Sequence, residues 1–369
     1  MAILDQHRAD LAALATRGRL RRLIPRAGVD LASNDYLGLA QSATLADSVA
    51  AAIARGVPVG SGGSRLLRGN HAEHEALEAE AAAFFGSESA LFFSSGYGAN
   101  ATLLSALPRR GDLIVHDALI HASVHEGLRS GRADRASAAH NDVQAFADAI
   151  AAWRAKGGKG RVWIAIESLY SMDGDTAPIA DFMALADAHD AFLLIDEAHA
   201  TGALGPDGRG LAAGVEGRDN VITLRTCGKA LGCEGALVCG PRLMTDYLVN
   251  RGRGFIFSTA PSPLMAAAVR AAIAIVRDEP ERRARLMALI AHAAASGLPA
   301  TGSQIIPIII GDDKRTMAIA AALQEQGFDV RGIRPPTVPA GTARLRVSLT
   351  LNATPDDVTA LAQAIRAQP

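Results

Sequence analysis

Residues 191–232 read AFLLIDEAHATGALGPDGRG and then LAAGVEGRDNVITLRTCGKALG, and this stretch decides the fold. Residues 191–195 form a short, uninterrupted apolar run, which is typical of a strand buried on both faces of a parallel sheet. A second run of this kind spans residues 221–224. Two such strands so close together predict an α/β protein built on a buried central sheet.

Polar side chains follow each of these two runs. Asp196, Glu197 and His199 come after the first run, and Lys229 follows the second in the segment TCGK. Open α/β sheets bind their ligands at the carboxyl ends of their strands. We therefore expect these acid, imidazole and amine groups to meet at one edge of the sheet.

Lys229 differs from the other lysines of the chain. Lysine occurs at only three other positions, Lys156 and Lys159 in the Gly-rich turn KGGKG and Lys314 in the charged turn DDKR. Lys229 alone has apolar and glycine neighbours. Because a desolvated lysine loses proton affinity and becomes a nucleophile, we predict that Lys229 forms a Schiff base.

The rest of the chain fits the same fold class. From Ala90 onward, apolar runs such as ALFF, DLIVH, VWIAIES and ALVCG alternate with helical segments. This alternation implies right-handed crossovers and a mostly parallel sheet flanked by helices. Beyond Gly302 the pattern becomes α+β, with QIIPIII and ARLRVSL as strands. We predict an N-terminal arm (1–40), a large domain (41–271) and a smaller α+β C-terminal domain (272–369).

Composition excludes several classes of function. The chain has 369 residues, of which 49% are hydrophobic and 20% charged, an ordinary globular composition. A net charge of −1 gives no electrostatic reason to expect nucleic acid or a membrane surface as a partner. The three cysteines, Cys227, Cys233 and Cys239, have neither zinc-knuckle nor CxxC spacing. With no signal-peptide core and no apolar run of membrane-spanning length, we expect a cytoplasmic protein without a bound metal.

The segment DEAH at 196–199 has an alternative interpretation as the magnesium and ATP motif of a helicase. That interpretation requires an upstream phosphate loop, GxxxxGK[ST]. The chain has none, because Gly228-Lys229 is followed by Ala230 and Gly158-Lys159 by Gly160. A capping aspartate with a structural histidine remains the simpler alternative for this segment alone.

Other motifs are weaker when taken singly. SSGYGAN at 94–100 joins a strand to a helix, and such a turn presents free N–H groups to a phosphate. ESLYSMDGD at 167–175 follows a strand and so reaches the same edge of the sheet. HAEHE at 71–75 matches no metal-binding pattern and predicts a solvated helix face. Arg344 and Arg346 alternate along a strand, so we expect one to face inward and to need an anionic partner.

The combination is more specific than its parts. A phosphate-binding turn, an acid after one strand and an isolated apolar lysine after the next all suit pyridoxal 5'-phosphate (PLP). That cofactor needs a carboxylate to keep its ring nitrogen protonated and a lysine for its Schiff base.

At this point the chain resembles the α-oxoamine synthases, fold-type-I PLP enzymes, over nearly its whole length. The motifs that carry the resemblance are SNDYLGL (33–39), SGGSRLLRGNHAEHEALE (61–78), SSGYGAN (94–100), HASVHEG (121–127), ESLYSMDGDTAP (167–178), IDEAHATG (195–202), TCGKALG (226–232) and FSTAPSP (257–263). The resemblance implies the aspartate-aminotransferase-like fold. It also implies the decarboxylating transfer of an acyl group to an amino acid.

The resemblance assigns roles around the cofactor ring. It implies that Lys229 holds the cofactor, that Asp196 pairs with the ring nitrogen, and that His199 pairs with the ring hydroxyl. His121 is expected to stack on one face of the ring, with Ala198 against the other.

The resemblance also assigns a phosphate site. Gly96 and Tyr97 are expected to offer backbone N–H groups and Thr226 its hydroxyl. Ser258 and Thr259 match a segment that reaches the phosphate from the partner subunit, which implies a homodimer with composite sites.

Substrate contacts follow from the same motifs. Ser171 is expected near the ring hydroxyl, Asn34 and Arg346 at the amino-acid carboxylate, and Arg21 and Thr337 near the acyl end. RPPTVPAGTARLR (334–346) favours the members that use L-alanine with pimeloyl-CoA or pimeloyl-acyl carrier protein. Sister activities, which use glycine with acetyl- or succinyl-CoA or serine with a long-chain acyl group, stay open, as does a cofactor-free scaffold.

Overall fold

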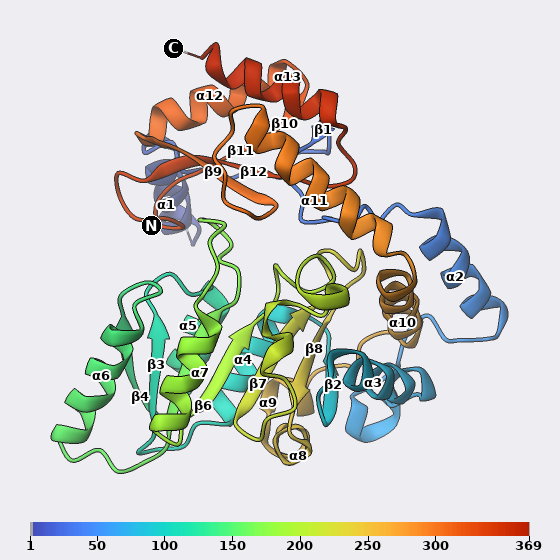
Figure 1. Cartoon of the computed structure of the whole chain (residues 1–369), viewed down its shortest axis with the longest axis vertical. Helices are drawn as coiled ribbons and strands as arrows, with labels where there is room; N and C mark the ends of the chain where they lie inside the picture. The colour runs from blue at the N-terminus through green and yellow to red at the C-terminus, as the bar shows by residue number, and fades with distance from the viewer. Residues whose placement is uncertain (1–2, 369) are drawn as a thin grey trace.

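The computed structural model describes residues 3–368 and is built on a seven-stranded sheet (Figure 1). The strand order is β2-β8-β7-β6-β5-β3-β4, and β8 alone runs antiparallel to its neighbours. The predicted α/β class with a mostly parallel sheet is therefore confirmed. The strands are β2 (Ser89–Phe93), β3 (Leu113–Asp117), β4 (Asp134–Ala138), β5 (Val162–Glu167), β6 (Phe192–Asp196), β7 (Val221–Thr226) and β8 (Ala236–Gly240).

Helices cover both faces of this sheet. One core cluster joins Leu103 and Val124 to strand residues such as Leu194, and the other joins Phe146 and Phe182 to the opposite face. Because both faces are covered, the central strands are largely apolar and carry most of their polar groups near their ends, with Thr223 and Arg225 of β7 as buried exceptions. The helices are α4 (Gly96–Ala106), α5 (Ala122–Ser130), α8 (Arg242–Arg251) and α9 (Arg253–Ile256) on one face, and α6 (Val143–Ala155) and α7 (Ile179–Ala188) on the other.

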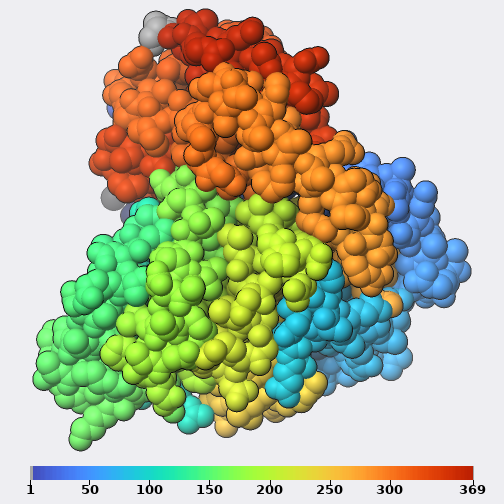
Figure 2. Space-filling view, viewed as in Figure 1, coloured from blue at the N-terminus to red at the C-terminus, as the bar shows by residue number. Residues whose placement is uncertain are grey.

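A smaller antiparallel sheet of order β11-β12-β9 lies above the carboxyl edge of the large one (Figure 1). In the space-filling view the C-terminal residues, in orange and red, form the upper part of the molecule (Figure 2). The N-terminal segment joins this part, because β1 pairs with β10 and Ser348 N–H donates to the Leu31 carbonyl at 2.9 Å. The elements are β1 (Val29–Asp30), β9 (Ile305–Gly311), β10 (Phe328–Asp329), β11 (Arg331–Ile333), β12 (Ala343–Ser348), α11 (Pro280–Ala295), α12 (Asp313–Glu325) and α13 (Pro355–Arg366).

A third group of helices packs at the side of the large sheet, where α10 contacts both α2 and α3. Residue 272, the predicted start of the small domain, falls inside α10, so the division into arm, large domain and small domain stays a prediction. Met1, Ala2 and Pro369 lie outside the described residues. Over residues 3–368, none of the helices combines the length and apolarity needed to cross a membrane. The remaining elements are α1 (Asp5–Thr16), α2 (Ala43–Ala54), η1 (Arg65–Gly69), α3 (Ala72–Phe85), η2 (Pro206–Gly208), η3 (Leu211–Gly214) and α10 (Pro263–Asp278).

The sequence pattern missed one strand–helix unit, β4 with α6. β4 reads DRASA and pairs only with β3 at the edge of the sheet. Only Ala138 of this strand is buried. An edge strand exposed to solvent carries no apolar run, so periodicity could not reveal it.

Candidate active site

The carboxyl edge of the large sheet gathers the predicted polar groups. Glu167 ends β5, Asp196 ends β6, and the two residues are partners in the strand register. Thr226 ends β7, three residues before Lys229. Asp196 and His199 are buried, with exposed fractions of 8% and 5%, so this edge is largely shielded from water.

Asn100, to which the sequence analysis gave no role, and the backbone of Ala198 orient Asp196. Asn100 Nδ2 donates to Asp196 Oδ2 at 2.7 Å, and Ala198 N–H donates to Asp196 Oδ1 at 2.9 Å. Asn100 Nδ2 also donates to Ser123 Oγ at 3.0 Å, and this hydroxyl lies 2.7 Å from His121 Nδ1. The expected ring-nitrogen partner and the expected stacking residue therefore share one network.

A continuous hydrogen-bonded chain links Lys229 to Arg346. Lys229 Nζ lies 2.7 Å from His199 Nε2, and His199 Nδ1 lies 2.6 Å from Tyr36 Oη. Tyr36 Oη donates to Asn34 Oδ1 at 3.0 Å, and Arg346 Nη2 donates to the same oxygen at 3.1 Å. The chain crosses from the large sheet, through the N-terminal segment, to β12 of the small sheet. Tyr36 is its unpredicted member.

Burial shifts the pKa values of two residues in this hydrogen-bonded chain, His199 and Lys229. Desolvation lowers the pKa of His199 well below its usual value, and the neighbouring Lys229 lowers it further. Desolvation also lowers the pKa of Lys229 to about 8, although the nearby carboxyl groups of Asp196 and Glu167 oppose the shift. An ammonium group can only donate, so protonated Lys229 leaves neutral His199 to donate from Nδ1 to Tyr36.

Arg346 is a buried guanidinium without a carboxylate partner among residues 3–368. Its side chain donates to the Ser171 carbonyl at 2.6 Å and to Ser348 Oγ at 2.6 Å, besides Asn34. Its exposed fraction is 6%. Since a buried charge is costly unless it is paired, this arginine needs an anionic ligand.

The expectation that only one of the two β12 arginines faces inward was wrong. Residues two apart on a strand point to the same face, and both Arg344 and Arg346 are buried. Arg344 donates to Asp173 Oδ1 at 2.5 Å, so its charge is already paired. Only Arg346 is left for a ligand.

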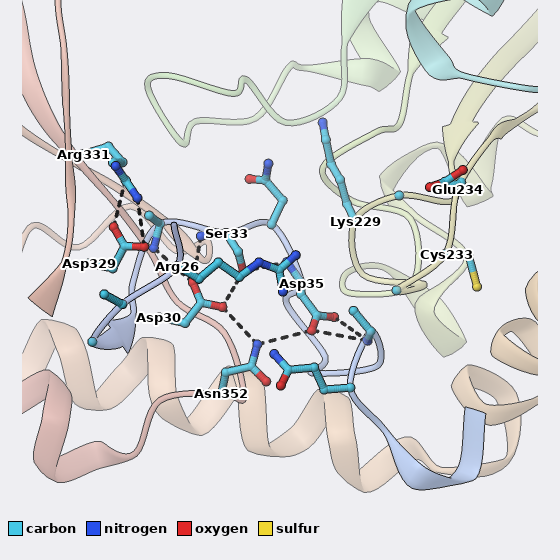
Figure 3. A pocket seen from close by; sticks show the side chains of 18 of the residues that line it. Arg26, Asp30, Ser33, Asp35, Lys229, Cys233, Glu234, Asp329, Arg331 and Asn352 are labelled. Carbon is cyan, nitrogen blue, oxygen red and sulfur yellow. Dashed lines mark hydrogen bonds and ion pairs between the residues drawn. The ribbon is translucent and has the colours of Figure 1, made fainter. Parts of the chain in front are cut away.

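A cavity of about 640 Å³, within the usual range for ligand sites, opens beside Lys229. Figure 3 shows Lys229 on one side and the ion pair of Arg331 with Asp329 on the opposite side. Asn34 also lines this cavity, and its amide nitrogen has no hydrogen-bond partner in the described part of the chain.

The N-terminus of α4 forms an anion cradle next to β7. The first N–H groups of a helix have no partner within it, and here they belong to Gly96 and Tyr97. Ser95 caps the helix by accepting from Gly98 N–H at 3.1 Å. A Cβ placed on Gly96 would lie 3.6 Å from Thr226 Oγ1, so the free N–H groups and this hydroxyl border one space. Such a space suits a phosphate group.

Four predicted residues are not brought to this site by the single chain. Ser258 and Thr259 follow α9, beside a segment where Ala260 N–H donates to the Gly63 carbonyl at 2.9 Å. Within residues 3–368 no hydrogen bond joins either residue to Lys229 or to the α4 cradle. Arg21 and Thr337 are exposed and do not line the cavity.

Glu167 is a buried site residue that the sequence analysis placed at the edge without giving it a role. Its exposed fraction is 2%, and Oε1 has no hydrogen-bond partner in residues 3–368. Desolvation raises the pKa of Glu167 well above its usual value, and the Asp196 carboxylate beside it raises it further. The signal was present in the sequence, since Glu167 ends an apolar run.

The prediction of a solvated face for HAEHE was wrong for His74. His71 caps α3 by accepting from Glu73 N–H at 3.1 Å. His74 is fully buried, with Nε2 2.8 Å from the Pro261 carbonyl. Tertiary packing of α3 under the 258–262 segment buries this histidine, which helical periodicity alone could not show. No group of side chains in the described ranges has the composition of a metal site.

A comparison with known protein families identifies the family to which this chain belongs. The model of the family described as aminotransferase class I and II matches residues 26–365. The chain therefore belongs to the aminotransferase class I and II family.

Two similar curated proteins carry the same, more specific name. The 8-amino-7-oxononanoate synthase of Anaeromyxobacter dehalogenans (strain 2CP-1 / ATCC BAA-258) is 44% identical, over 94% of this chain and 91% of that protein. The protein of the same name from Azoarcus sp. (strain BH72) is 42% identical, over 99% of this chain and 97% of its own length.

Solved structures agree on the fold. Serine palmitoyltransferase from S. paucimobilis, solved with bound PLP–myriocin, superposes with a TM-score of 0.87 at 26% identity, over 99% of this chain and 97% of that one. An 8-amino-7-oxononanoate synthase from Francisella tularensis gives a TM-score of 0.76 at 28% identity, over 92% and 96%. The predicted fold-type-I architecture is confirmed.

We predict that Lys229 is the residue that reacts with PLP. After incubation with PLP and borohydride reduction, peptide mapping should find the label on Lys229. Because only the free amine attacks an aldehyde, labelling should increase as pH rises through the Lys229 pKa of about 8. Lys229→Ala is the control that should remove the label. A label on Lys156, Lys159 or Lys314 in the unaltered protein would contradict the assignment.

Proposed function

We propose that this chain catalyses the decarboxylating condensation of L-alanine with a pimeloyl thioester to give 8-amino-7-oxononanoate, carbon dioxide and the free thiol. This is the reaction of 8-amino-7-oxononanoate synthases, a step of biotin synthesis. Identities of 42% and 44% over nearly the whole chain support it. The acyl carrier is coenzyme A or an acyl carrier protein.

PLP is the cofactor that the site fits. The desolvated amine of Lys229, the buried carboxylate of Asp196 and the anion cradle of α4 with Thr226 provide the three groups that this cofactor requires. When bound, PLP supplies an electron sink for a carbanion at the amino-acid α-carbon. We propose that His199 and Ser171 hold its ring hydroxyl, with His121 and Ala198 on the two ring faces.

The chain's own residues then perform the positioning and the proton transfer. Arg346 and the amide nitrogen of Asn34 bind the amino-acid carboxylate. The neutral amine of Lys229 accepts the proton that leaves the α-carbon, and a pKa near 8 suits this role at neutral pH. Asp196, held by Asn100, provides the fixed negative charge that would keep the ring nitrogen of the cofactor protonated, so that the cationic ring could draw electron density from the reacting carbon.

One observation carries the proposal. Arg346 is a buried guanidinium that has no carboxylate partner among residues 3–368, and it lies on the same hydrogen-bonded chain as Lys229. A carboxylate bound there lies at a fixed position relative to the reactive amine. This arrangement favours an α-amino acid as the substrate that reacts at Lys229.

The second candidate is the condensation of serine with a long-chain acyl group. It is favoured by the TM-score of 0.87 with serine palmitoyltransferase, against 0.76 with the synthase from Francisella tularensis. We rank it lower because the sequence identity to serine palmitoyltransferase is 26%, whereas identity to 8-amino-7-oxononanoate synthases reaches 44%.

The proposed function predicts one product. Incubation with pimeloyl-CoA or pimeloyl-acyl carrier protein and L-alanine, glycine or serine should give 8-amino-7-oxononanoate, detected by mass spectrometry, from alanine. Acetyl-, succinyl- and palmitoyl-CoA serve as competing donors. A dominant product from serine and palmitoyl-CoA would replace the proposal with its sister activity.

We further propose a homodimer in which Ser258 and Thr259 complete the phosphate site of the partner subunit, while Arg21 and Thr337 border the acyl end. The four residues are exposed or half-buried and do not line the cavity beside Lys229, as a role across an interface requires. Such a site is composite, because each half comes from a different copy.

Complementation tests the composite site. Mixing inactive Lys229→Ala with an inactive Ser258→Ala/Thr259→Ala variant should restore about a quarter of the activity, since random pairing gives half heterodimers with one intact site each. Mass spectrometry confirms the subunit exchange. Absence of recovery after exchange would show that each site comes from one chain.

A cytoplasmic location stays a proposal. It is supported by the three cysteines, none of which forms a disulfide in the described residues. Burial raises the pKa of Cys233, beside the cavity, to about 12, so this thiol stays protonated at neutral pH.

A further inference from the structure

His140 lies between two carboxylates outside the site described above. Its Nδ1 lies 2.9 Å from Asp117 Oδ1, and its Nε2 lies 2.9 Å from Asp175 Oδ2. A neutral imidazole has a single N–H and can donate to only one of them. Although burial favours the neutral ring, hydrogen bonds to Asp117 and Asp175 raise the pKa of His140 to about 10. His140 is therefore a protonated imidazolium that is hydrogen-bonded to both carboxylates, and we call this arrangement the His140 cross-link.

The first carboxylate, that of Asp117, is hydrogen-bonded to the start of the segment that leads to His121. Asp117 is the last residue of β3 and is fully buried. Its two oxygens also accept from Leu119 N–H and Asn141 N–H, both at 2.8 Å. Four residues after Asp117, His121 caps the N-terminus of α5 and enters the network of Ser123 and Asp196.

The second carboxylate, that of Asp175, belongs to the loop between β5 and α7. Asp175 also accepts from Asn141 Nδ2 at 2.7 Å, and its carbonyl accepts from Tyr170 N–H at 2.9 Å. The Tyr170 ring stands edge-on to the His140 ring with centroids 4.4 Å apart. The next residue, Ser171, offers the carbonyl that Arg346 Nε binds at 2.6 Å.

Other polar contacts also hold this loop, among them the ion pair of Arg344 with Asp173 and the hydrogen bond from Ser303 Oγ to the Gly174 carbonyl at 2.7 Å. The bridge through His140, with Asn141 beside it, is what joins the loop to the Asp117 segment. Four buried side-chain atoms of the loop and of Asn141 have no hydrogen-bond partner in residues 3–368, namely Ser168 Oγ, Tyr170 Oη, Asp175 Oδ1 and Asn141 Oδ1.

We propose that His140 is a positioning residue for the amino-acid site. Its imidazolium ties the segment that carries His121 to the loop that carries Ser171, and through the Ser171 carbonyl it fixes the guanidinium of Arg346. This inference rests on the proposed function, because it assigns Arg346 to the substrate carboxylate. It predicts that His140 controls amino-acid affinity without touching the substrate.

The direct test is His140→Gln in the cofactor-loaded enzyme. A glutamine side chain is uncharged and has both of its N–H donors on one nitrogen, so it cannot reproduce the two separate ring N–H groups with which the imidazolium reaches the two carboxylates. The dissociation constant for L-alanine, followed by the visible spectrum of the cofactor without any acyl donor, should rise by at least about tenfold. The turnover number at saturating alanine, and the KM for the thioester, should change by less than about threefold.

A second readout needs neither cofactor nor substrate. Backbone amides of residues 168–176 should exchange with deuterium faster in cofactor-free His140→Gln than in the unaltered protein. His292→Gln is the matched control, because His292 Nε2 also makes two hydrogen bonds, to the Pro355 carbonyl at 3.0 Å and to Thr359 Oγ1 at 2.8 Å, far from the site. This control should change neither the alanine affinity nor the exchange of the loop.

Asp175→Asn provides the partner variant and tests the cross-link even if His140→Gln fails to fold. If the bridge acts as a unit, the double variant should lose no more alanine affinity than the worse single variant. Unchanged affinity and unchanged loop exchange in a folded variant would overturn the proposal, as would additive effects of the two changes. If the unaltered protein itself fails to bind alanine, the proposed function is wrong, while the exchange measurement still decides whether His140 holds the loop.

Discussion

The structure depends on a carboxylate at the end of a buried strand. β6 is apolar because helices cover both faces of the sheet, so its first polar side chain, Asp196, is delivered at the carboxyl edge in nearly dry surroundings. A carboxylate there is tolerable only with donors aimed at it, and Asn100 and the Ala198 N–H supply them. The same packing that buries the sheet therefore creates a fixed, oriented negative charge.

The second constraint is the connection between the two sheets. The hydrogen-bonded chain from Lys229 through His199, Tyr36 and Asn34 to Arg346 joins β7, the N-terminal segment and β12. Its two ends are a basic amine and a guanidinium that has no carboxylate partner among residues 3–368. A ligand carboxylate matches the guanidinium, so the junction of the two parts of the fold is where we propose that the substrate binds.

Much of the fold and part of the site could be predicted from sequence. Asp196, His199 and Lys229 follow apolar runs, and the carboxyl ends of neighbouring strands must meet at one edge. Asn100 and Tyr36 could not be placed in the network in this way, because their partners come from elements brought close only by tertiary packing.

The features that could not be predicted from sequence have similar causes. β4 was overlooked because an edge strand needs no apolar run. His74 was expected in solvent because helical periodicity does not show which segment packs on the helix. The pairing of Arg344 with Asp173 separates two arginines that look alike in sequence, because folding leaves Arg346 without a carboxylate partner in the described part of the chain.

The most direct test of this account is Asp196→Asn. The change keeps the shape and the hydrogen-bonding capacity of the side chain but removes its charge, so the protein should fold and still load PLP on Lys229. Exchange of the alanine α-proton with solvent deuterium, measured without an acyl donor, should slow by at least about a hundredfold, roughly 2.7 kcal/mol in activation free energy. Exchange at the unaltered rate in the folded, PLP-loaded variant would show that Asp196 is not the charge on which the reaction depends.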